Sequence, residues 1–351
     1  MKRALLTGSA VLGFAAVLAA AAAPSASPVP AVLRNGALGS NKATTAAALA
    51  VARAGQRMVV GGERGIVLLS DDAGASWHQA KVPVQTSLTA IRFVDARTGW
   101  AVGHLGTILT TGDGGLTWTL QLDGVRAAAL QAASLRAEGN DRAERIASQL
   151  VAEGPDKPFF DIDFADSQHG FAVGAYNLAF MTSDGGRTWT PLSARLPNPK
   201  GLHLTAVRVA GKDVYIAGEQ GLLMHSSDGG ATFEALPSPY KGTFFGLLLT
   251  RSGTLLAYGL RGNVFRTPDR GAHWVKIDSG VSASVSAGIE RDDGSLVLLA
   301  QTGDVLVSRD GGASFQKRPT REQAPAAGLA AAPDGGLIVA TLRGVRRQPK
   351  L

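Results

Sequence analysis

The chain is built from short apolar stretches separated by turn residues. In one representative unit, apolar residues run from 88 to 93, turn residues follow at 95–98, and a second apolar stretch covers 99–102. A glycine-bounded turn at 103–106 then leads to a third stretch at 107–110. Apolar or alternating runs this short predict β-strands rather than helices. The same order recurs along most of the chain, so we expect an all-β protein made of repeated units.

After its third strand, a typical unit carries the motif [Ser/Thr]-x-Asp-x-Gly-x-[Ser/Thr]-aromatic, of which Thr182–Trp189 is one copy. The motif, called the box below, occurs six times, and its one departure is His273 in place of Ser or Thr. Its aspartates, to which we assign a structural role, are Asp72, Asp113, Asp184, Asp228, Asp269 and Asp310. They lie 41, 71, 44, 41 and 41 residues apart. A period of this size is typical of a β-propeller with four strands in each blade.

The residue types of the box suit a tight turn. An aspartate at the head of a turn accepts hydrogen bonds, and we expect its donors to be the backbone N–H groups one and two residues on. Glycine supplies a positive φ, and the closing Trp or Phe is expected to fill the gap between adjacent blades. The alternative interpretation, six metal sites, is weaker because a calcium loop needs several carboxylates and each box repeats only one. We therefore predict no bound metal.

The turn between the second and third strands of each unit occurs seven times, once more than the box. These turns begin at residues 62, 103, 174, 218, 259, 300 and 341. The last unit starts near Ala326 and ends at Leu351 without a box, which leaves it three strands' worth of chain. Because an open sheet edge exposes unpaired backbone, we expect the segment Val32–Asn35 to supply the missing outer strand. The sequence thus predicts a seven-bladed β-propeller over residues 29–351.

One insertion, at residues 123–158, interrupts the repeat. Val125–Ala137 is rich in strong helix formers, Glu138–Asp141 resembles a helix stop followed by a new N-cap, and Arg142–Glu153 predicts a second helix. We therefore expect a helical hairpin between blades 2 and 3. Connections between blades leave a propeller on the same face as the turns between second and third strands, so the hairpin is predicted to lie over that face.

That face, the turn face, carries the side chains that differ from unit to unit. Inserted loops on a rigid scaffold commonly carry function, so we predict a binding rim there. Its candidate residues are Arg64, His104, Tyr176, Glu219, Arg261 and Arg343. The alternative is that the hairpin only covers an apolar patch. Of the six histidines, only His104 is expected on this rim.

Charged residues also interrupt the otherwise apolar first strands of three units. Arg92, Asp163 and Arg208 are expected to face the central channel, where charged side chains pair with each other or meet water.

The N-terminus predicts export from the cytoplasm. Residues 1–26 contain Lys2 and Arg3, an alanine-rich apolar run and then small residues and prolines, the layout of a signal peptide. An uncleaved membrane anchor is the alternative. The chain has no cysteine, which excludes disulfides and thiol chemistry, and its net charge of +7 comes from scattered residues. We therefore predict a periplasmic protein, free or membrane-associated, with no nucleic-acid partner.

The boxes resemble the Asp-box, or BNR, repeats of sialidases and other propeller glycosidases. With the segments Gly99–Gly103, Lys157–Phe164 and Gly170–Gly174, they resemble more closely the photosystem II stability/assembly factor family, in particular its relatives from non-photosynthetic bacteria. This resemblance implies a docking platform for a membrane protein under assembly, in which an arginine patch takes part. Arg64, Arg261 and Arg343 occupy equivalent turn positions, so a basic rim is expected.

Catalytic motifs are missing from the sequence. It contains no sialidase Arg-Ile-Pro motif, and neither a nucleophile elbow nor a dinucleotide fingerprint. We therefore predict a non-enzymatic assembly or docking factor, without cofactor, for a membrane or periplasmic protein complex such as an envelope transporter. The alternative is a carbohydrate-active or carbohydrate-binding propeller, for which Glu63 and Glu219 are the candidate acids.

Overall fold

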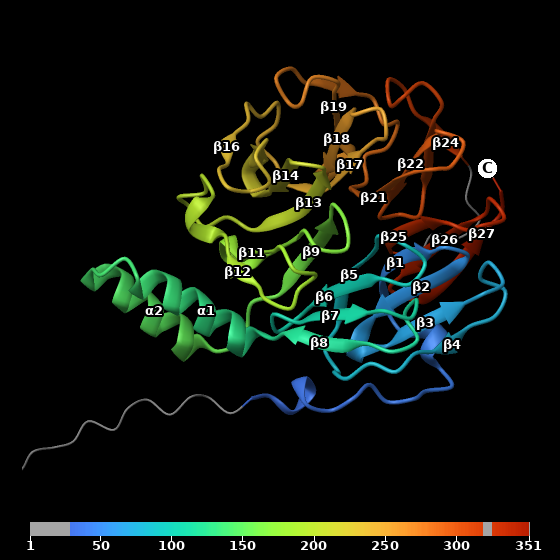
Figure 1. The fold of residues 1–351 in the computed structure, drawn as a ribbon. Coiled ribbons are helices and arrows are strands. Elements are labelled where there is room, and N and C mark those ends of the chain that lie inside the picture. Colours follow the sequence, from blue (N-terminus) through green and yellow to red (C-terminus); the bar gives the residue numbers. More distant parts are fainter. Residues whose placement is uncertain (1–28, 319–324, 351) are drawn as a thin grey trace, which may run out of the picture.

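The computed structural model describes residues 29–318 and 325–350, which form a ring of seven antiparallel sheets around a central channel (Figure 1). The predicted seven-bladed propeller is therefore confirmed. The predicted signal peptide, residues 1–26, lies outside the described residues and stays a prediction. No helix within 29–318 or 325–350 combines the length and the apolar character needed to span a bilayer.

Each blade is one continuous stretch of chain, in which consecutive strands pair from the channel outward. The innermost strands are β1 (Ala48–Ala54), β5 (Leu88–Phe93), β9 (Phe159–Phe164), β13 (Leu204–Ala210), β17 (Phe244–Leu249), β21 (Val285–Glu290) and β25 (Ala326–Ala331). The second strands are β2 (Arg57–Gly62), β6 (Gly99–Gly103), β10 (Gly170–Gly174), β14 (Asp213–Gly218), β18 (Leu255–Gly259), β22 (Leu296–Ala300) and β26 (Leu337–Thr341).

The third strands are β3 (Val67–Ser70), β7 (Ile108–Thr111), β11 (Ala179–Thr182), β15 (Leu223–Ser226), β19 (Val264–Thr267), β23 (Val305–Ser308) and β27 (Gly344–Gln348). The outermost strands are short: β4 (His78–Gln79), β8 (Thr119–Leu122), β12 (Thr190–Pro191), β16 (Glu234–Ala235), β20 (Val275–Ile277) and β24 (Gln316–Arg318). The second strands are buried almost throughout, because blades pack against both of their faces.

Each box is held together by hydrogen bonds from its own residues to its aspartate. In the third blade, Thr182 donates its hydroxyl to Asp184 Oδ1 at 2.9 Å, and the Thr188 N–H donates to the same oxygen at 2.9 Å. The Thr188 hydroxyl donates to Oδ2 at 2.6 Å. The expected donors, one and two residues after the aspartate, were wrong: the partners lie two residues before it and four after it. His273 fills the same place in its box, with Nδ1 2.7 Å from Asp269 Oδ2.

The aromatic residue that ends each box packs into the joint with the preceding blade, as predicted. Trp118 of blade 2 is buried in a cluster with Val59 and Leu69 of blade 1. The corresponding residues at the other joints are Trp77, Trp189, Phe233, Trp274 and Phe315. Gly115 of the box has φ 89°, and a Cβ there would approach Leu69 to 3.2 Å. The glycine therefore lets the turn lie close against the neighbouring blade.

The seventh blade has three strands in the described residues, and the prediction that Val32–Asn35 completes it was wrong. Ala31–Leu33 forms a 3-10 turn beside blade 1, where the Gln85 N–H donates to the Val32 carbonyl at 2.7 Å. The exposed edge belongs to β27, which carries Arg346 and Arg347. Charged side chains on an edge strand discourage further pairing, so this blade does not need a fourth strand.

The predicted helical hairpin is present between blades 2 and 3. It consists of α1 (Gly124–Arg136), capped by Asp123, and α2 (Asp141–Glu153), capped by Asn140. It begins at the turn face, where the Gly124 N–H donates to the Leu105 carbonyl at 2.8 Å. From there it projects outward beside blade 3 (Figure 1). It therefore flanks the turn face instead of lying over it.

The box hydrogen bonds predict a stability that depends on acid. The hydroxyl and N–H of Thr188 lower the pKa of Asp184 from 3.8 to about 2, and the pKa values of the other five box aspartates are also lowered. A lowered folded-state pKa stabilises the fold above the unfolded pKa, and this contribution is lost as pH falls toward 2. We expect the melting temperature to fall steadily between about pH 4.5 and pH 2.

Asp184→Asn tests this assignment. It should lower the stability at neutral pH by about 1–2 kcal/mol, because charge-assisted hydrogen bonds are lost, and it should reduce the acid dependence. Asp156→Asn is the matched control, since the Asp156 carboxylate makes only an exposed ion pair with Lys157 at 3.5 Å. An unchanged acid dependence in Asp184→Asn would contradict the assignment.

Candidate functional site

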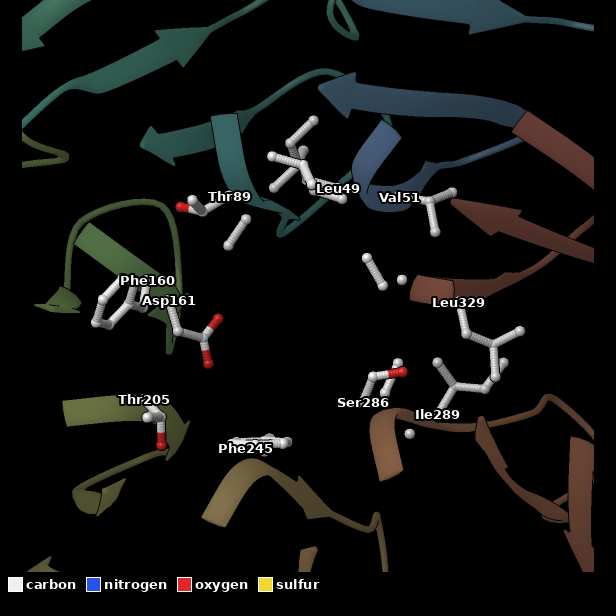
Figure 2. Close-up of a pocket in the computed structure, with 18 of the residues that line it drawn as sticks. Leu49, Val51, Thr89, Phe160, Asp161, Thr205, Phe245, Ser286, Ile289 and Leu329 are labelled. Carbon is white, nitrogen blue, oxygen red and sulfur yellow. The ribbon is translucent and has the colours of Figure 1, made fainter. Parts of the chain in front are cut away.

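The channel opens on the turn face through a ring of seven side chains. Each innermost strand is out of register with its neighbour between its first and third residues, so that the second residue forms a bulge. The seven bulged residues, called the mouth ring below, are Leu49, Thr89, Phe160, Thr205, Phe245, Ser286 and Ala327. All seven are partly exposed and line one cavity of about 370 Å³ (Figure 2). None of them is charged.

Two carboxylates of β9 lie deeper along the channel and bind the neighbouring blade. Asp161 Oδ2 accepts from the Val207 N–H at 3.1 Å and from Arg208 Nη1 at 2.5 Å. Asp163 Oδ2 accepts from the Val209 N–H at 2.9 Å. Asp161 and Asp163 share one face of β9, since side chains two apart on a strand point the same way. The two aspartates therefore tie blade 3 to blade 4.

The expected channel arginines are found there. Arg92 of blade 2 lies with Nε 3.1 Å from Asp163 Oδ1, and Arg208 pairs with Asp161. Both arginines line the cavity below the mouth ring and a second cavity toward the other face. Burial opposes ionisation of Arg208, but the carboxylates of Asp161 and Asp163 outweigh it and raise the arginine pKa above its ordinary value. The network is thus charged but locally balanced.

Tyr258 of β18 completes the wall of this chamber. Its ring is buried, and burial raises the pKa of its hydroxyl. Gly246 and Gly288 make room for the ring: a Cβ at either position would lie within 3.0 Å of Tyr258 atoms. Both glycines lie on the innermost strands of adjacent blades, so the tyrosine reaches the channel only because those strands lack side chains there.

Aromatic side chains lead from the rim to the mouth ring at the joint of blades 3 and 4. The Tyr176 and His203 rings are 4.5 Å apart, and the Phe160 ring stacks with His203 at 6.0 Å. The Glu219 carboxylate accepts from both the N–H and Nδ1 of His203 at 2.9 Å, and so fixes the imidazole. Tyr176 is 63% exposed. We call Tyr176, His203 and Phe160 the aromatic strip.

The turns that carry these side chains are strained at one equivalent position. Arg64, Leu105, Tyr176, Gln220 and Arg261 all have φ between 52° and 57°. The left-handed region costs a non-glycine residue roughly 1 kcal/mol, and such strain is often found at functional sites.

The hairpin is connected to the same rim. Gln131 of α1 donates to the Ser193 hydroxyl at 3.4 Å, and this hydroxyl donates to the Asn177 carbonyl at 2.8 Å. Asn177 in turn donates its side-chain amide to the Ser193 carbonyl at 3.1 Å. Since Asn177 directly follows Tyr176, the hairpin supports the turn that holds the aromatic strip.

The predicted rim residues are spread around the turn face. The structure brings together only Tyr176 and Glu219, which meet through His203. The exposed residues Arg64, His104, Arg261 and Arg343 lie on four other blades. Among the described residues, the guanidinium groups of the three arginines make no hydrogen bond or ion pair. Equivalent positions in different blades thus give separate positive charges, and the predicted basic rim is not one cluster.

Some residues of the site were not recognised in the sequence. His203 lies on the rim although only His104 was expected there, because it immediately precedes an innermost strand and reaches Glu219. Asp161 was missed beside Asp163, although their spacing of two residues places both on one face. Phe160 and Phe245 were indistinguishable from core residues, since a one-residue bulge has no sequence mark of its own.

The chain is similar to known proteins across most of its repeats. A family model described as "Photosynthesis system II assembly factor YCF48" matches residues 69–142 and 140–324. A relative from Synechococcus, "Photosystem II assembly lipoprotein Ycf48", is 32% identical over 169 residues, which are 45% of this chain and 48% of the relative. The match thus spans about half the length of that curated relative.

Solved structures confirm the fold. The structure titled "YCF48 bound to D1 peptide" has a TM-score of 0.63 at 15% identity and covers 90% of this chain and 99% of its own. A glycoside hydrolase family 74 enzyme of Niastella koreensis has a TM-score of 0.60 at 13% identity, covering 87% of this chain and 52% of its own. At these identities the likeness concerns architecture alone.

The channel network predicts an asymmetric response to substitution. Asp161→Ala removes the acceptor of the Val207 N–H and leaves the Arg208 guanidinium without its carboxylate. We expect the free energy of unfolding, measured by urea denaturation, to fall by about 3–5 kcal/mol. Arg208→Met should cost clearly less, because Asp161 keeps the N–H donors of Ile162 and Val207.

The exposed pair of Arg53 and Asp292, 2.9 Å apart, provides the control. Asp292→Ala should change stability by less than about 1 kcal/mol. If Arg208→Met cost as much as Asp161→Ala, the aspartate would not be the centre of this network.

Proposed function

Since the chain belongs to the family of the photosynthesis system II assembly factor YCF48, we propose that it is a non-enzymatic assembly factor. In this proposal it docks a segment of a membrane or periplasmic protein complex on its turn face. The observation that carries the proposal is the aromatic strip, which places the exposed Tyr176 ring beside the open mouth of the channel.

Both faces of the ring expose arginines that make no hydrogen bond or ion pair among the described residues, such as Arg187 and Arg309 on the box face, but the faces differ in the aromatic surface that they expose. On the box face, the aspartate and hydroxyl groups are consumed within each box. On the turn face, the guanidinium groups of Arg64, Arg261 and Arg343 have no partner among the described residues, and Tyr176 is exposed. An exposed aromatic ring is what an interaction surface offers, and Tyr176 therefore supports docking on the turn face.

The candidate carboxylates of the turn face and those of the channel are already engaged. Glu63 accepts from the Ala47 N–H at 3.0 Å, and Glu219 holds His203. Asp161 and Asp163 are paired with arginines. Glycoside hydrolysis needs two carboxylates that flank one bond and act on it directly. These engaged carboxylates favour docking over catalysis.

The client and the compartment follow from the sequence-level predictions. A chain exported by a signal peptide would meet membrane proteins from the periplasmic side, and a transporter or another envelope complex under assembly is the proposed client. Glycan binding is the second candidate, because the exposed ring of Tyr176 also suits stacking on a sugar.

Site-specific photocrosslinking in the native cells tests the proposal. A photoreactive phenylalanine analogue replaces Tyr176 on the turn face or, as the matched control, Arg187 in the box of the same blade. We expect position 176 to crosslink one membrane or periplasmic protein and position 187 to give none. Equal patterns at both positions would reject the turn face. The absence of any protein adduct at 176, together with glycan binding by the purified protein, would favour the second candidate.

The hairpin can be tested in the same cells. Deleting residues 124–157 removes the support that Gln131 gives to the turn of Tyr176. We expect the adduct at position 176 to decrease while the melting temperature of the ring changes little. An adduct of unchanged yield would exclude the hairpin from docking.

A further inference from the structure

We infer that the mouth ring and the aromatic strip together receive one large uncharged side chain, tyrosine or tryptophan, from an extended segment of the docked protein. This inference rests on the proposed docking function and names the chemistry that the turn face selects. The inserted side chain would occupy the cavity of about 370 Å³ below the mouth ring. This volume is near the lower end of the range for ligand pockets, which suits a single large side chain.

The side chains of the mouth ring give the channel entrance an uncharged and largely apolar surface. Phe160 and Phe245 lie on either side of Thr205, and Leu49 and Leu329 face them across the cavity (Figure 2). The hydroxyls in the ring already donate to backbone carbonyls, those of Thr89 and Thr205 in the next blade and that of Ser286 in its own. Thr89 and Thr205 donate to the Phe159 and Phe244 carbonyls at 2.7 and 2.6 Å, and Ser286 donates to the Leu299 carbonyl at 3.2 Å. An entering apolar surface is therefore not required to break any of these bonds.

The floor of the cavity suits a polar but neutral tip. Asp161 and Arg208 neutralise each other, so an incoming carboxylate or ammonium would lose its hydration without gaining an unpaired counter-charge. The hydrogen bonds of the Arg208 guanidinium use Nη1 alone, which leaves Nε and Nη2 as donors without a partner among the described residues. A phenol oxygen can accept from such a donor, and a phenol or an indole N–H can donate to a carboxylate. Leucine or phenylalanine would leave these polar groups unmatched.

The aromatic strip is the reason for inferring that the docked segment is extended and not helical. The His203 ring contacts the exposed Tyr176 at the rim, 4.5 Å away, and Phe160 of the mouth ring, 6.0 Å away. A chain crossing them can keep its backbone at the rim while one side chain reaches down into the cavity. A helix, about 10–12 Å wide with its side chains, would rest on the strip without reaching the floor.

Side-chain analogues test the receptor without the unknown client. The probes are p-cresol and 3-methylindole, with propionate and butylammonium as charged comparisons, and binding is followed by saturation-transfer NMR on the purified protein. Ala327→Trp fills the mouth from blade 7, and Phe245→Ser removes one of its aromatic walls. Leu342→Ser, at an exposed site on the turn face, is the control.

We expect p-cresol and 3-methylindole to bind the wild type and Leu342→Ser equally, and the charged probes to give no signal. Phe245→Ser should weaken binding by roughly tenfold, and Ala327→Trp should abolish it. If Ala327→Trp does not fold, Phe245→Ser decides alone. Equal signals in wild type and Phe245→Ser, or binding of the charged probes, would overturn the inference.

The crosslink at position 176 separates this inference from the proposed function. If the client adduct forms in the wild-type background and is lost when Ala327→Trp is added, both stand. If the adduct persists with the mouth filled, docking is retained and insertion of a side chain is rejected. If no adduct forms in either background, the docking proposal itself fails, even if p-cresol and 3-methylindole bind to the purified protein.

Discussion

The packing of adjacent blades depends on a polar turn, the box, which fixes the position of the aromatic side chain at its end. In each box, an aspartate accepts from the hydroxyl before it and from the N–H and side chain of the residue four positions after it, as Asp184 does with Thr182 and Thr188; that side chain is a hydroxyl in five boxes and His273 in the sixth. The preceding blade adds to these bonds, since Trp100 and Gln121 donate to the Gly185 carbonyl of the box at 3.2 and 2.8 Å. The rigidity of the turn fixes the direction of the aromatic residue that follows, and that residue fills the joint with the preceding blade. Polar groups that are satisfied locally thus allow apolar packing between blades.

The joint between blades 6 and 7 shows what the box contributes, because blade 7 has none. Its cluster consists of aliphatic residues, with Val297 and Leu299 of blade 6 against Leu329 and Val339 of blade 7. Ridges of aliphatic side chains are therefore sufficient to join two blades once the remainder of the ring fixes their spacing. The boxes occupy one face for structural reasons, which leaves the opposite face free to vary. The strained turns between second and third strands, the exposed Tyr176 ring and the mouth of the channel all lie on that variable face.

The sequence revealed the periodic part of this structure well. The spacing of the box aspartates and the recurring turn between second and third strands were enough for seven blades, and helix-forming composition marked the hairpin. The closure of the ring was mispredicted, because an open edge can be protected by Arg346 and Arg347 on β27 instead of by another strand. The residues of the candidate site were harder to predict from the sequence than the blades. The bulge at Phe160 and the meeting of His203 with Tyr176 depend on one-residue shifts and on contacts between blades, and neither has a periodic signal.

Every blade is made from one uninterrupted stretch of chain, and the terminal segment at 31–40 lies along blade 1 instead of joining blade 7. Each sheet can consequently form from contacts that are local in sequence, one blade after another along the chain. The closure of the ring, where β25 and β26 pack against β1, brings residues far apart in sequence together through side-chain packing. Folding thus resembles the growth of a linear repeat array whose two ends then touch. A chain of this design can close its ring without pairing any strand of its last blade with a strand of its first.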